Sequence, residues 1–213
     1  MILQNNILKE YLKNVYFISG TACGGKSTTA GVLHEKYGVP VYRIDEHFDE
    51  HRQMSDPAFQ PSMNRSFKDA DEFFGRTVDE YEDWLINNSR EQLDFIVLDL
   101  IRLSQDSRII CDCLMTPEQA AQLTVPERVA FLIREPVNLA DQYADRPDHQ
   151  GFRNWLESAS DVSKAKAVCN ETLCRINRRA TEDIIGSGYF FLERKGDKTP
   201  EEVAELVAQH FAW

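Results

Sequence analysis

The chain has 213 residues, of which 42% are hydrophobic and 28% are charged, values typical of one globular domain. Its formal net charge of −11 leaves no basic surplus to neutralise a phosphate backbone, which excludes nucleic acid as its main partner. No apolar run reaches about 18 residues and residues 1–6 do not resemble a signal peptide, so we expect neither membrane insertion nor secretion. Five cysteines without zinc-site spacing indicate reduced thiols and a cytoplasmic protein.

The first part of the chain alternates apolar runs with helical patterns. Residues 1–13 can form a short helix or a loosely held arm. Residues 15–19 and 39–44 predict strands, and residues 27–37 between them predict a helix that Gly38 ends.

A polar stretch follows the second strand. Residues 52–68 contain Pro57 and Pro61 and predict a loop or insertion. A helix is predicted from about Ala70, with a break at residues 87–89.

The next segment allows two interpretations. Residues 95–99 can be a strand that ends in Asp99, or residues 89–103 can be a helix. We favour the helix, because no turn residue interrupts this stretch and strands are seldom so long. A turn then leads into a third strand at residues 108–113, which brings Asp112 to its end.

The second half of the chain continues the alternation. Capping boxes at residues 116–119 and 199–202 predict the starts of a short helix and of the last helix. Between them we predict strands at residues 128–133 and 189–192 and a long helix at residues 160–185. This order predicts an α/β fold, a three-layer sandwich with a five-stranded parallel sheet.

A phosphate-binding motif joins the first strand to the first long helix. The sequence GTACGGKS at residues 20–27 matches the P-loop pattern G-x-x-x-x-G-K-[ST]. Such a loop turns successive backbone N–H groups toward one phosphate chain, and the positive end of the following helix points to the same place. Lys26 can reach the β- and γ-phosphates, and the Ser27 hydroxyl can hold Mg²⁺. The predicted nucleotide-binding residues are consecutive: Gly20, Thr21, Ala22, Cys23, Gly24, Gly25, Lys26, Ser27 and Thr28.

Two aspartates are predicted to lie beside this loop. Parallel sheets bind ligands at the carboxyl ends of their strands, and Asp45 and Asp112 end the predicted second and third strands. Asp45 could accept a proton from a substrate hydroxyl or anchor the substrate, and its alternative role is a helix N-cap. Asp112 could hold Mg²⁺ through water, the Walker B role, and its alternative role is a turn residue.

Arginines in a polar segment are candidates for contact with a phosphoryl group. Arg134, Arg146 and Arg153 lie in or beside residues 135–158. On a mobile flap such side chains can close over the transferring group, stabilise its charge and exclude water. Solvated surface arginines are the alternative.

The chain resembles small P-loop kinases of the nucleoside and nucleotide monophosphate kinase group. The resemblance rests on GTACGGKST (20–28), YRID (42–45), IICD (109–112), FLIR (131–134) and the ending GYFFLER…TPEEVAELV. It implies a P-loop NTPase fold, ATP and Mg²⁺ as cofactors, and ATP-dependent phosphorylation of a small molecule.

The resemblance also implies roles for single residues. Lys26 would contact the phosphates, Asp45 the acceptor, and Arg146 would act from the lid. Ser27 and Asp112 would hold the metal. The loop at residues 194–197 would border the adenine.

We therefore expect one kinase domain over residues 1–213, with residues 46–70 as an acceptor-binding insertion and residues 135–158 as a small helical lid. The acceptor can be a nucleoside or nucleotide, a sugar, an acid or an antibiotic. The oligomeric state can be a monomer or a homodimer. The alternative is an ATP-binding or ATPase regulatory module without transfer chemistry. A GTPase is disfavoured, because N-K-x-D is absent and the one D-x-x-G falls late in a helix, at residues 183–186.

Overall fold

The computed structural model describes residues 4–146 and 149–213, which form two compact units. The sheet unit consists of Met1–Phe48, Asp94–Glu135 and Ala180–Trp213. The helical unit consists of Asp49–Leu93 and Pro136–Arg179. Helices α6 (Val78–Leu103) and α10 (Val162–Ser187) each contain a boundary and contribute residues to both units.

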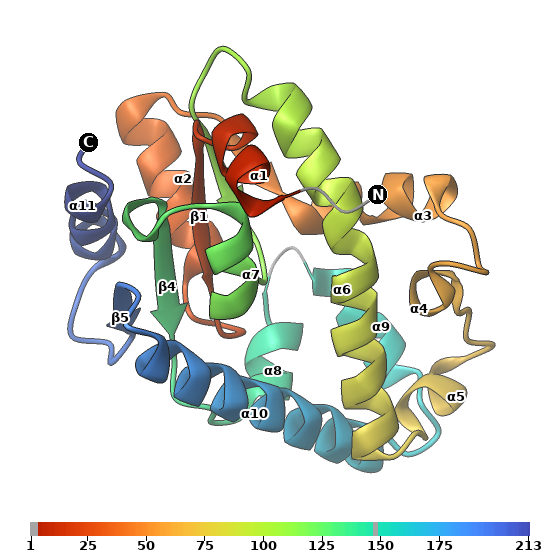
Figure 1. The fold of residues 1–213 in the computed structure, drawn as a ribbon. Coiled ribbons are helices and arrows are strands. Elements are labelled where there is room, and N and C mark those ends of the chain that lie inside the picture. The colour runs from red at the N-terminus through yellow and green to blue at the C-terminus, as the bar shows by residue number, and fades with distance from the viewer. Residues whose placement is uncertain (1–3, 147–148) are drawn as a thin grey trace. The chain divides into compact units, whose positions relative to one another are not determined.

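The sheet unit is built on a parallel sheet with the strand order β2-β3-β1-β4-β5, and Figure 1 labels β1, β4 and β5 of it. Its strands are short and mostly apolar, as buried parallel strands should be. Their bounds are β1 (Val15–Gly20), β2 (Val41–Arg43), β3 (Ile109–Asp112), β4 (Val129–Ile133) and β5 (Phe191–Glu193). The predicted α/β fold with a five-stranded parallel sheet is thereby confirmed.

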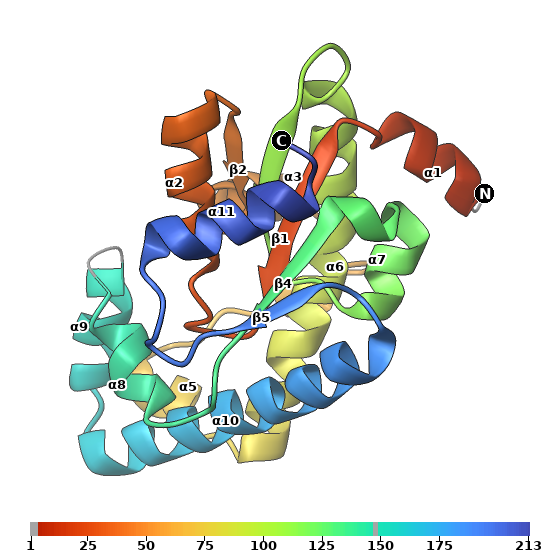
Figure 2. The same cartoon turned by 90° about the vertical axis from the view of Figure 1, so that its left-hand side faces the viewer.

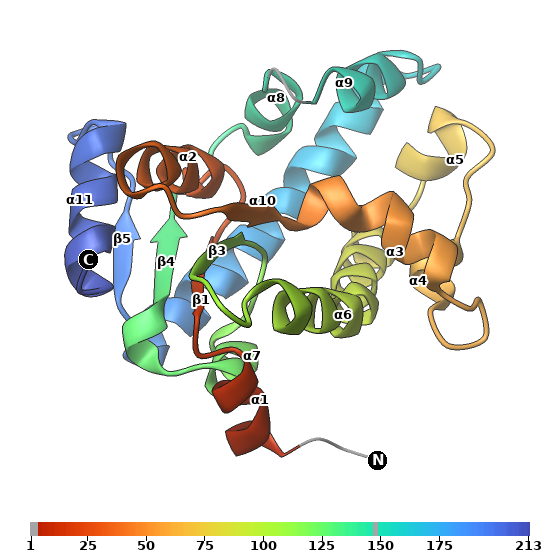
Figure 3. The ribbon, with the colours of Figure 1, turned by 90° about the horizontal axis from the view of Figure 1, so that it is seen from above.

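Helices cover both faces of this sheet (Figures 2 and 3). Helices α2 (Lys26–Tyr37) and α11 (Pro200–His210) pack on one face, and α1 (Asn5–Tyr11) and α7 (Pro117–Leu123) lie on the other. Short 3₁₀ turns, η1 (Ile44–His47) and η2 (Pro126–Arg128), follow β2 and precede β4. The core under α2 and α11 consists of small and aliphatic side chains with one phenylalanine: Ile18, Ala30, Leu33, Val39, Ile110, Ala130, Leu132, Ala204, Val207, Ala208 and Phe211.

Both predicted capping boxes form at the starts of their helices. The Thr116 side chain accepts from the backbone N–H of Gln119, and Thr199 accepts from that of Glu202. In each box the third side chain of the helix bonds back to the backbone of the cap, which satisfies donors that a helix start leaves unpaired.

The helical unit has a core rich in aromatic side chains. Besides residues 78–93 of α6 and 162–179 of α10, it holds α3 (Phe48–Met54), α4 (Pro61–Asn64), α5 (Ala70–Phe74), α8 (Leu139–Ala144) and α9 (Gln150–Glu157). Helix α3 begins one residue before the unit. Phe73, Phe74, Tyr81 and Trp155 pack among small residues of α8 and α10.

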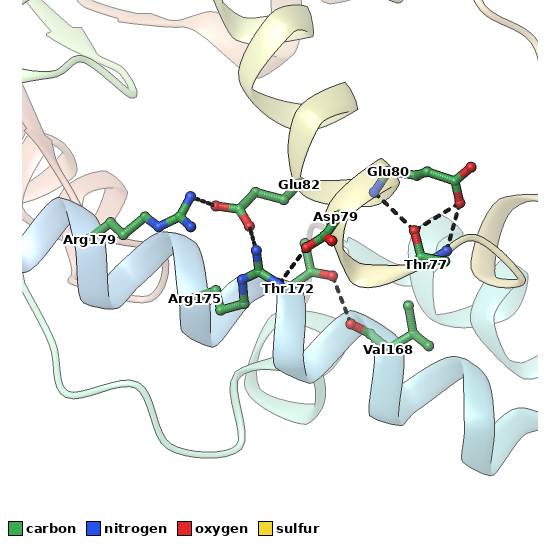
Figure 4. A network of polar contacts seen from close by, with 8 residues as sticks. All are labelled: Thr77, Asp79, Glu80, Glu82, Val168, Thr172, Arg175 and Arg179. Atoms are coloured by element: carbon green, nitrogen blue, oxygen red, sulfur yellow. Dashed lines mark hydrogen bonds and ion pairs between the residues drawn. The ribbon is translucent and has the colours of Figure 1, made fainter.

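An ion-pair network joins the two long helices inside this unit (Figure 4). The Glu82 side chain is only 3% exposed and pairs with both Arg175, at 2.8 Å, and Arg179. Arg175 also pairs with Asp79 at 2.7 Å. A buried carboxylate is tolerated here because two guanidinium groups compensate its charge.

Two expectations about the helical elements need correction. Residues 89–103 are helical as predicted, but the expected break at residues 87–89 is wrong, because α6 is continuous. The buried Asn88 side chain donates to the Ser62 carbonyl at 3.4 Å, so it makes a tertiary contact without ending the helix. The chain instead breaks at Gly75, where a Cβ would lie 2.4 Å from the Asp71 carbonyl oxygen. Residues 52–68, predicted as a loop or insertion, contain α4 and the end of α3, so they are not all loop.

Among the described residues, no helix is both long enough and apolar enough to cross a membrane.

Candidate active site

The carboxyl ends of the strands bring the predicted site residues of the sheet unit to one edge. Gly20 ends β1 and opens the P-loop, and Asp112 ends β3 directly beside β1. Asp112 is in register with Ile18 on one side and with Arg43 on the other. This edge is where open parallel sheets bind their ligands.

The P-loop needs glycine at positions where it approaches β4. A Cβ on Gly20 would lie 2.0 Å from the Leu132 carbonyl oxygen, and one on Gly24 would lie 2.3 Å from the same oxygen. Gly20 and Gly25 also have φ values of 128° and 96°, which side chains disfavour. The glycines of the motif therefore set the close packing and the curl of the loop.

Hydrogen bonds hold the loop to the end of β4. The Thr21 backbone N–H donates to the Leu132 carbonyl at 3.0 Å, and the Thr21 hydroxyl accepts from the Arg134 N–H at 2.9 Å. The Lys26 ammonium donates to the Thr21 carbonyl at 2.8 Å, so its side chain folds back along the loop. The loop is thus preorganised by its own contacts.

The start of α2 has the features of an anion site. Its N-cap is Gly25, which has no side chain to cap the helix, and its first turn carries no acidic residue. A helix start leaves backbone N–H groups without intrahelical acceptors and carries a partial positive charge. These groups, with Lys26, fit a phosphate chain.

The Asp112 carboxylate is buried next to the Ser27 hydroxyl. It is 7% exposed, and burial raises the pKa of Asp112 above its ordinary value. A hydrogen bond from Ser27 and the charge of Lys26 oppose that rise, whereas the charge of Asp45 adds to it. Hydroxyl and carboxylate oxygens are the ligands that Mg²⁺ prefers, so this pair fits a magnesium ion.

The competing candidate for the Walker B position lies elsewhere. Asp99 is inside α6, where it accepts from the Tyr42 hydroxyl at 2.9 Å and pairs with Arg102 at 3.2 Å. Asp112, and not Asp99, therefore ends the strand beside the P-loop.

Asp45 lies on the same edge and is exposed. It belongs to η1, the 3₁₀ turn directly after β2, and is not an N-cap there. Its charge reaches the Asp112 carboxylate, so the two side chains share one electrostatic environment. An exposed carboxylate at this position can accept a hydrogen bond or a proton from a hydroxyl group.

A cavity of about 330 Å³ adjoins the P-loop. It lies between Gly24, Gly25 and Thr28 on one side and residues 193–198 on the other. The Arg194 side chain reaches the loop, since its Nη1 would lie 3.8 Å from a Cβ on Gly25. Residues 194–197 thus line the same cavity as the P-loop. No sequence pattern indicates that the Arg194 side chain approaches Gly25.

The remaining predicted arginines lie in the helical unit. Arg146 follows α8, and its guanidinium carbon is 5.8 Å from the centre of the Tyr143 ring. Arg153 donates to the Ala144 carbonyl at 3.1 Å and pairs with Asp145, so it holds α8 and α9 together. The predicted lid, residues 135–158, contains these two helices. Its residues 147 and 148 lie outside the described part of the chain. The role of Arg146 in a lid stays a prediction.

The comparisons with known proteins identify no family. No family model matches the sequence, and no curated protein matches it. Among solved structures, the chain is similar to a shikimate kinase from Aquifex aeolicus vf5, with 19% sequence identity and a TM-score of 0.40 over 93% of this chain and 96% of that chain. A likeness at this level establishes neither a family nor a function.

Proposed function

We propose that this chain is an ATP-dependent kinase that transfers a phosphoryl group to a small molecule. The observation that carries the proposal is the P-loop between β1 and α2, with the buried Asp112 at the end of the neighbouring strand β3. A phosphate cradle and a paired hydroxyl and carboxylate are the parts that nucleotide-dependent phosphoryl transfer requires on the donor side.

Each residue of the donor side has a distinct task in this proposal. Lys26 and the N–H groups at the start of α2 bind and orient the phosphate chain. Ser27 and Asp112 hold Mg²⁺, which, when bound with ATP, neutralises charge on the phosphate oxygens. Lys26 gives up its contact with the Thr21 carbonyl when it binds phosphate. The cavity beside Arg194 takes the base and ribose.

The acceptor side of the proposal involves Asp45 and the helical unit. Asp45 accepts or orients the proton of the acceptor hydroxyl, because its carboxylate is exposed at the same edge as the P-loop. The helical unit recognises the acceptor, since it contains most of residues 46–70 and nearly all of the predicted lid. Arg146 acts from the lid on the transferring group.

The test is a product screen with the full-length protein. The protein is incubated with ATP and Mg²⁺ and with pools of acids, sugars, nucleosides, nucleotides and aminoglycoside antibiotics, and mass spectrometry detects a mass gain of one phosphoryl group. We expect one pool to yield a product, and Lys26→Ala to abolish it with little loss of folding. Slow ATP hydrolysis without a phosphorylated product in any pool would support a regulatory ATPase instead.

A further inference from the structure

One buried cation of the helical unit lacks counter-groups. Arg76 lies in the turn between α5 and α6 and is only 7% exposed. Its Nε donates to the Phe73 carbonyl at 2.8 Å. Its two terminal nitrogens have no hydrogen-bond partner among the described residues. An arginine stays charged at neutral pH and carries most of its N–H donors on these nitrogens.

Aromatic rings surround this guanidinium group. Its central carbon lies 4.3–4.9 Å from the ring centres of Phe73, Phe67, Tyr81 and Trp84. Ring faces attract a cation, but they do not replace the strong oxygen acceptors that its N–H groups need. A buried charge with unmet donors is costly unless an anion completes the site.

The charged residues that the structure describes near Arg76 do not compensate its buried charge by direct contact. Burial lowers the pKa of Arg76 to about 10, and the positive charge of Arg65 contributes to the lowering. Glu72 and Glu80 act on Arg76 only at a distance, because their carboxylates accept hydrogen bonds from Lys68 and from Thr77 instead. Within the described part of this unit, no carboxylate accepts a hydrogen bond from the Arg76 terminal nitrogens.

A second arginine marks the side from which an anion can approach. The Arg65 guanidinium carbon is 4.8 Å from the centre of the Phe67 ring, which also contacts Arg76. Arg65 is exposed and Phe67 is half-buried, so this wall of the aromatic cluster reaches solvent. Residues 65–69 form neither helix nor strand, so no regular backbone hydrogen-bond pattern holds this wall.

We infer that Arg76, with Arg65 beside it, binds an anionic group of the acceptor molecule, a carboxylate or a phosphate. The planar fork of two terminal nitrogens matches two oxygens of such a group. The inference rests on the proposed kinase function, and it narrows the acceptor to an acid or a phosphorylated compound. Neutral sugars and unphosphorylated nucleosides are disfavoured.

A titration of the full-length protein tests the anion site without any turnover. A non-hydrolysable ATP analogue with Mg²⁺ first saturates the P-loop, so that added anions do not bind there. Inorganic phosphate or acetate is then titrated while the side-chain Nε–Hε signal of Arg76 is followed by NMR, with the signal assigned through Arg76→Lys. We expect a saturable shift, and the anion that causes it distinguishes a phosphate from a carboxylate ligand. No shift with either anion would mean that the rings alone hold Arg76.

Isothermal titration calorimetry of matched variants, with the anion that shifts the Arg76 signal, tests the same site. Arg76→Gln should weaken binding of the active anion by roughly 30-fold or more. The same change at Arg90, an exposed arginine of α6, should leave the affinity for this anion unaltered. If Arg76→Gln does not fold, Arg65→Gln at the exposed arginine should still weaken binding by roughly two- to fivefold. Equal affinity in wild type and in these variants would overturn the inference.

The outcomes separate the inference from the proposed function. Transfer to a neutral acceptor at an unchanged rate in Arg76→Lys would overturn the anion site and leave the kinase in place. Anion binding at Arg76 with no transfer to any acceptor would remove the kinase and leave the anion site. When both hold, Arg76→Lys should raise the KM for the acceptor more than it lowers kcat.

Discussion

The backbone of the P-loop at Gly24 lies so close to Leu132 that a Cβ on Gly24 would be 2.3 Å from the Leu132 carbonyl oxygen. Gly24→Ala must therefore shift the loop or β4, and the free energy of unfolding should fall by about 1–3 kcal/mol. Binding of ATP should weaken as well, because the displaced N–H groups no longer converge.

Gly31 supplies the control for this change. It lies inside α2, and a Cβ there would meet nothing within 4 Å. Gly31→Ala should stabilise the protein by about 0.5–1 kcal/mol through helix propensity alone. Urea unfolding and ATP titration of both variants check the prediction, and ATP affinity equal to wild type in Gly24→Ala would contradict it.

The buried carboxylate of Asp112 predicts opposite effects on stability and on metal binding. Burial raises the pKa of Asp112, which means that the charged carboxylate lowers the stability of the folded protein. Asp112→Asn should leave thermal stability unchanged or raise it, whereas activity with Mg²⁺ should fall by roughly 10- to 100-fold. Melting curves with and without ATP and Mg²⁺ separate the effects. If Asp112→Asn melts at a lower temperature than wild type, but ATP with Mg²⁺ raises the melting temperature of both proteins equally, the metal role of Asp112 is refuted.

The sequence predicted the sheet well because its signals are local. Short apolar runs, two capping boxes and the P-loop pattern each depend on neighbouring residues, and β1, α2, α7 and α11 appear where they were expected. The choice of Asp112 over Asp99 followed from the same local reasoning, since a turn precedes β3 and none interrupts residues 91–103.

The helical unit was harder to predict because its structure depends on tertiary contacts. Asn88 resembles a helix breaker in sequence, but its side chain is buried against Ser62. Arg76 is one arginine in a polar turn, and the rings around it come from residues up to nine positions before it and eight after it. No local pattern marks such a cluster.

The Glu82 network predicts a large loss of stability from a small change. Glu82→Gln removes the charge that holds Arg175 and Arg179, and the free energy of unfolding should fall by about 1.5–3 kcal/mol. The loss stays below that of a fully buried unpaired charge, because the two arginine side chains are 28% and 62% exposed. Asp79 is 76% exposed, so Asp79→Asn should cost less than about 1 kcal/mol. Denaturant titration measures both, and an equal loss would contradict the prediction.

The cysteines should differ sharply in reactivity. Burial raises the pKa of Cys169 to about 12 and also raises that of Cys111 and of Cys174. Only the thiolate reacts with a disulfide reagent, so at pH 8 these buried thiols should react slowly, as should the buried Cys113. Half-exposed Cys23 should therefore give one fast equivalent.

The Cys23 thiol then reports on the P-loop directly. ATP with Mg²⁺ should slow its modification, because a phosphate chain in the cradle covers the loop, and Cys23→Ser should remove the fast phase altogether. The release of the reagent's leaving group is followed at pH 7, 8 and 9. The rate of every phase should rise with its own thiolate fraction, and the Cys23 phase should stay the fastest at each pH. Several fast equivalents would contradict the predicted protection of the buried thiols. A Cys23 rate that ATP does not change would count against phosphate binding at this loop.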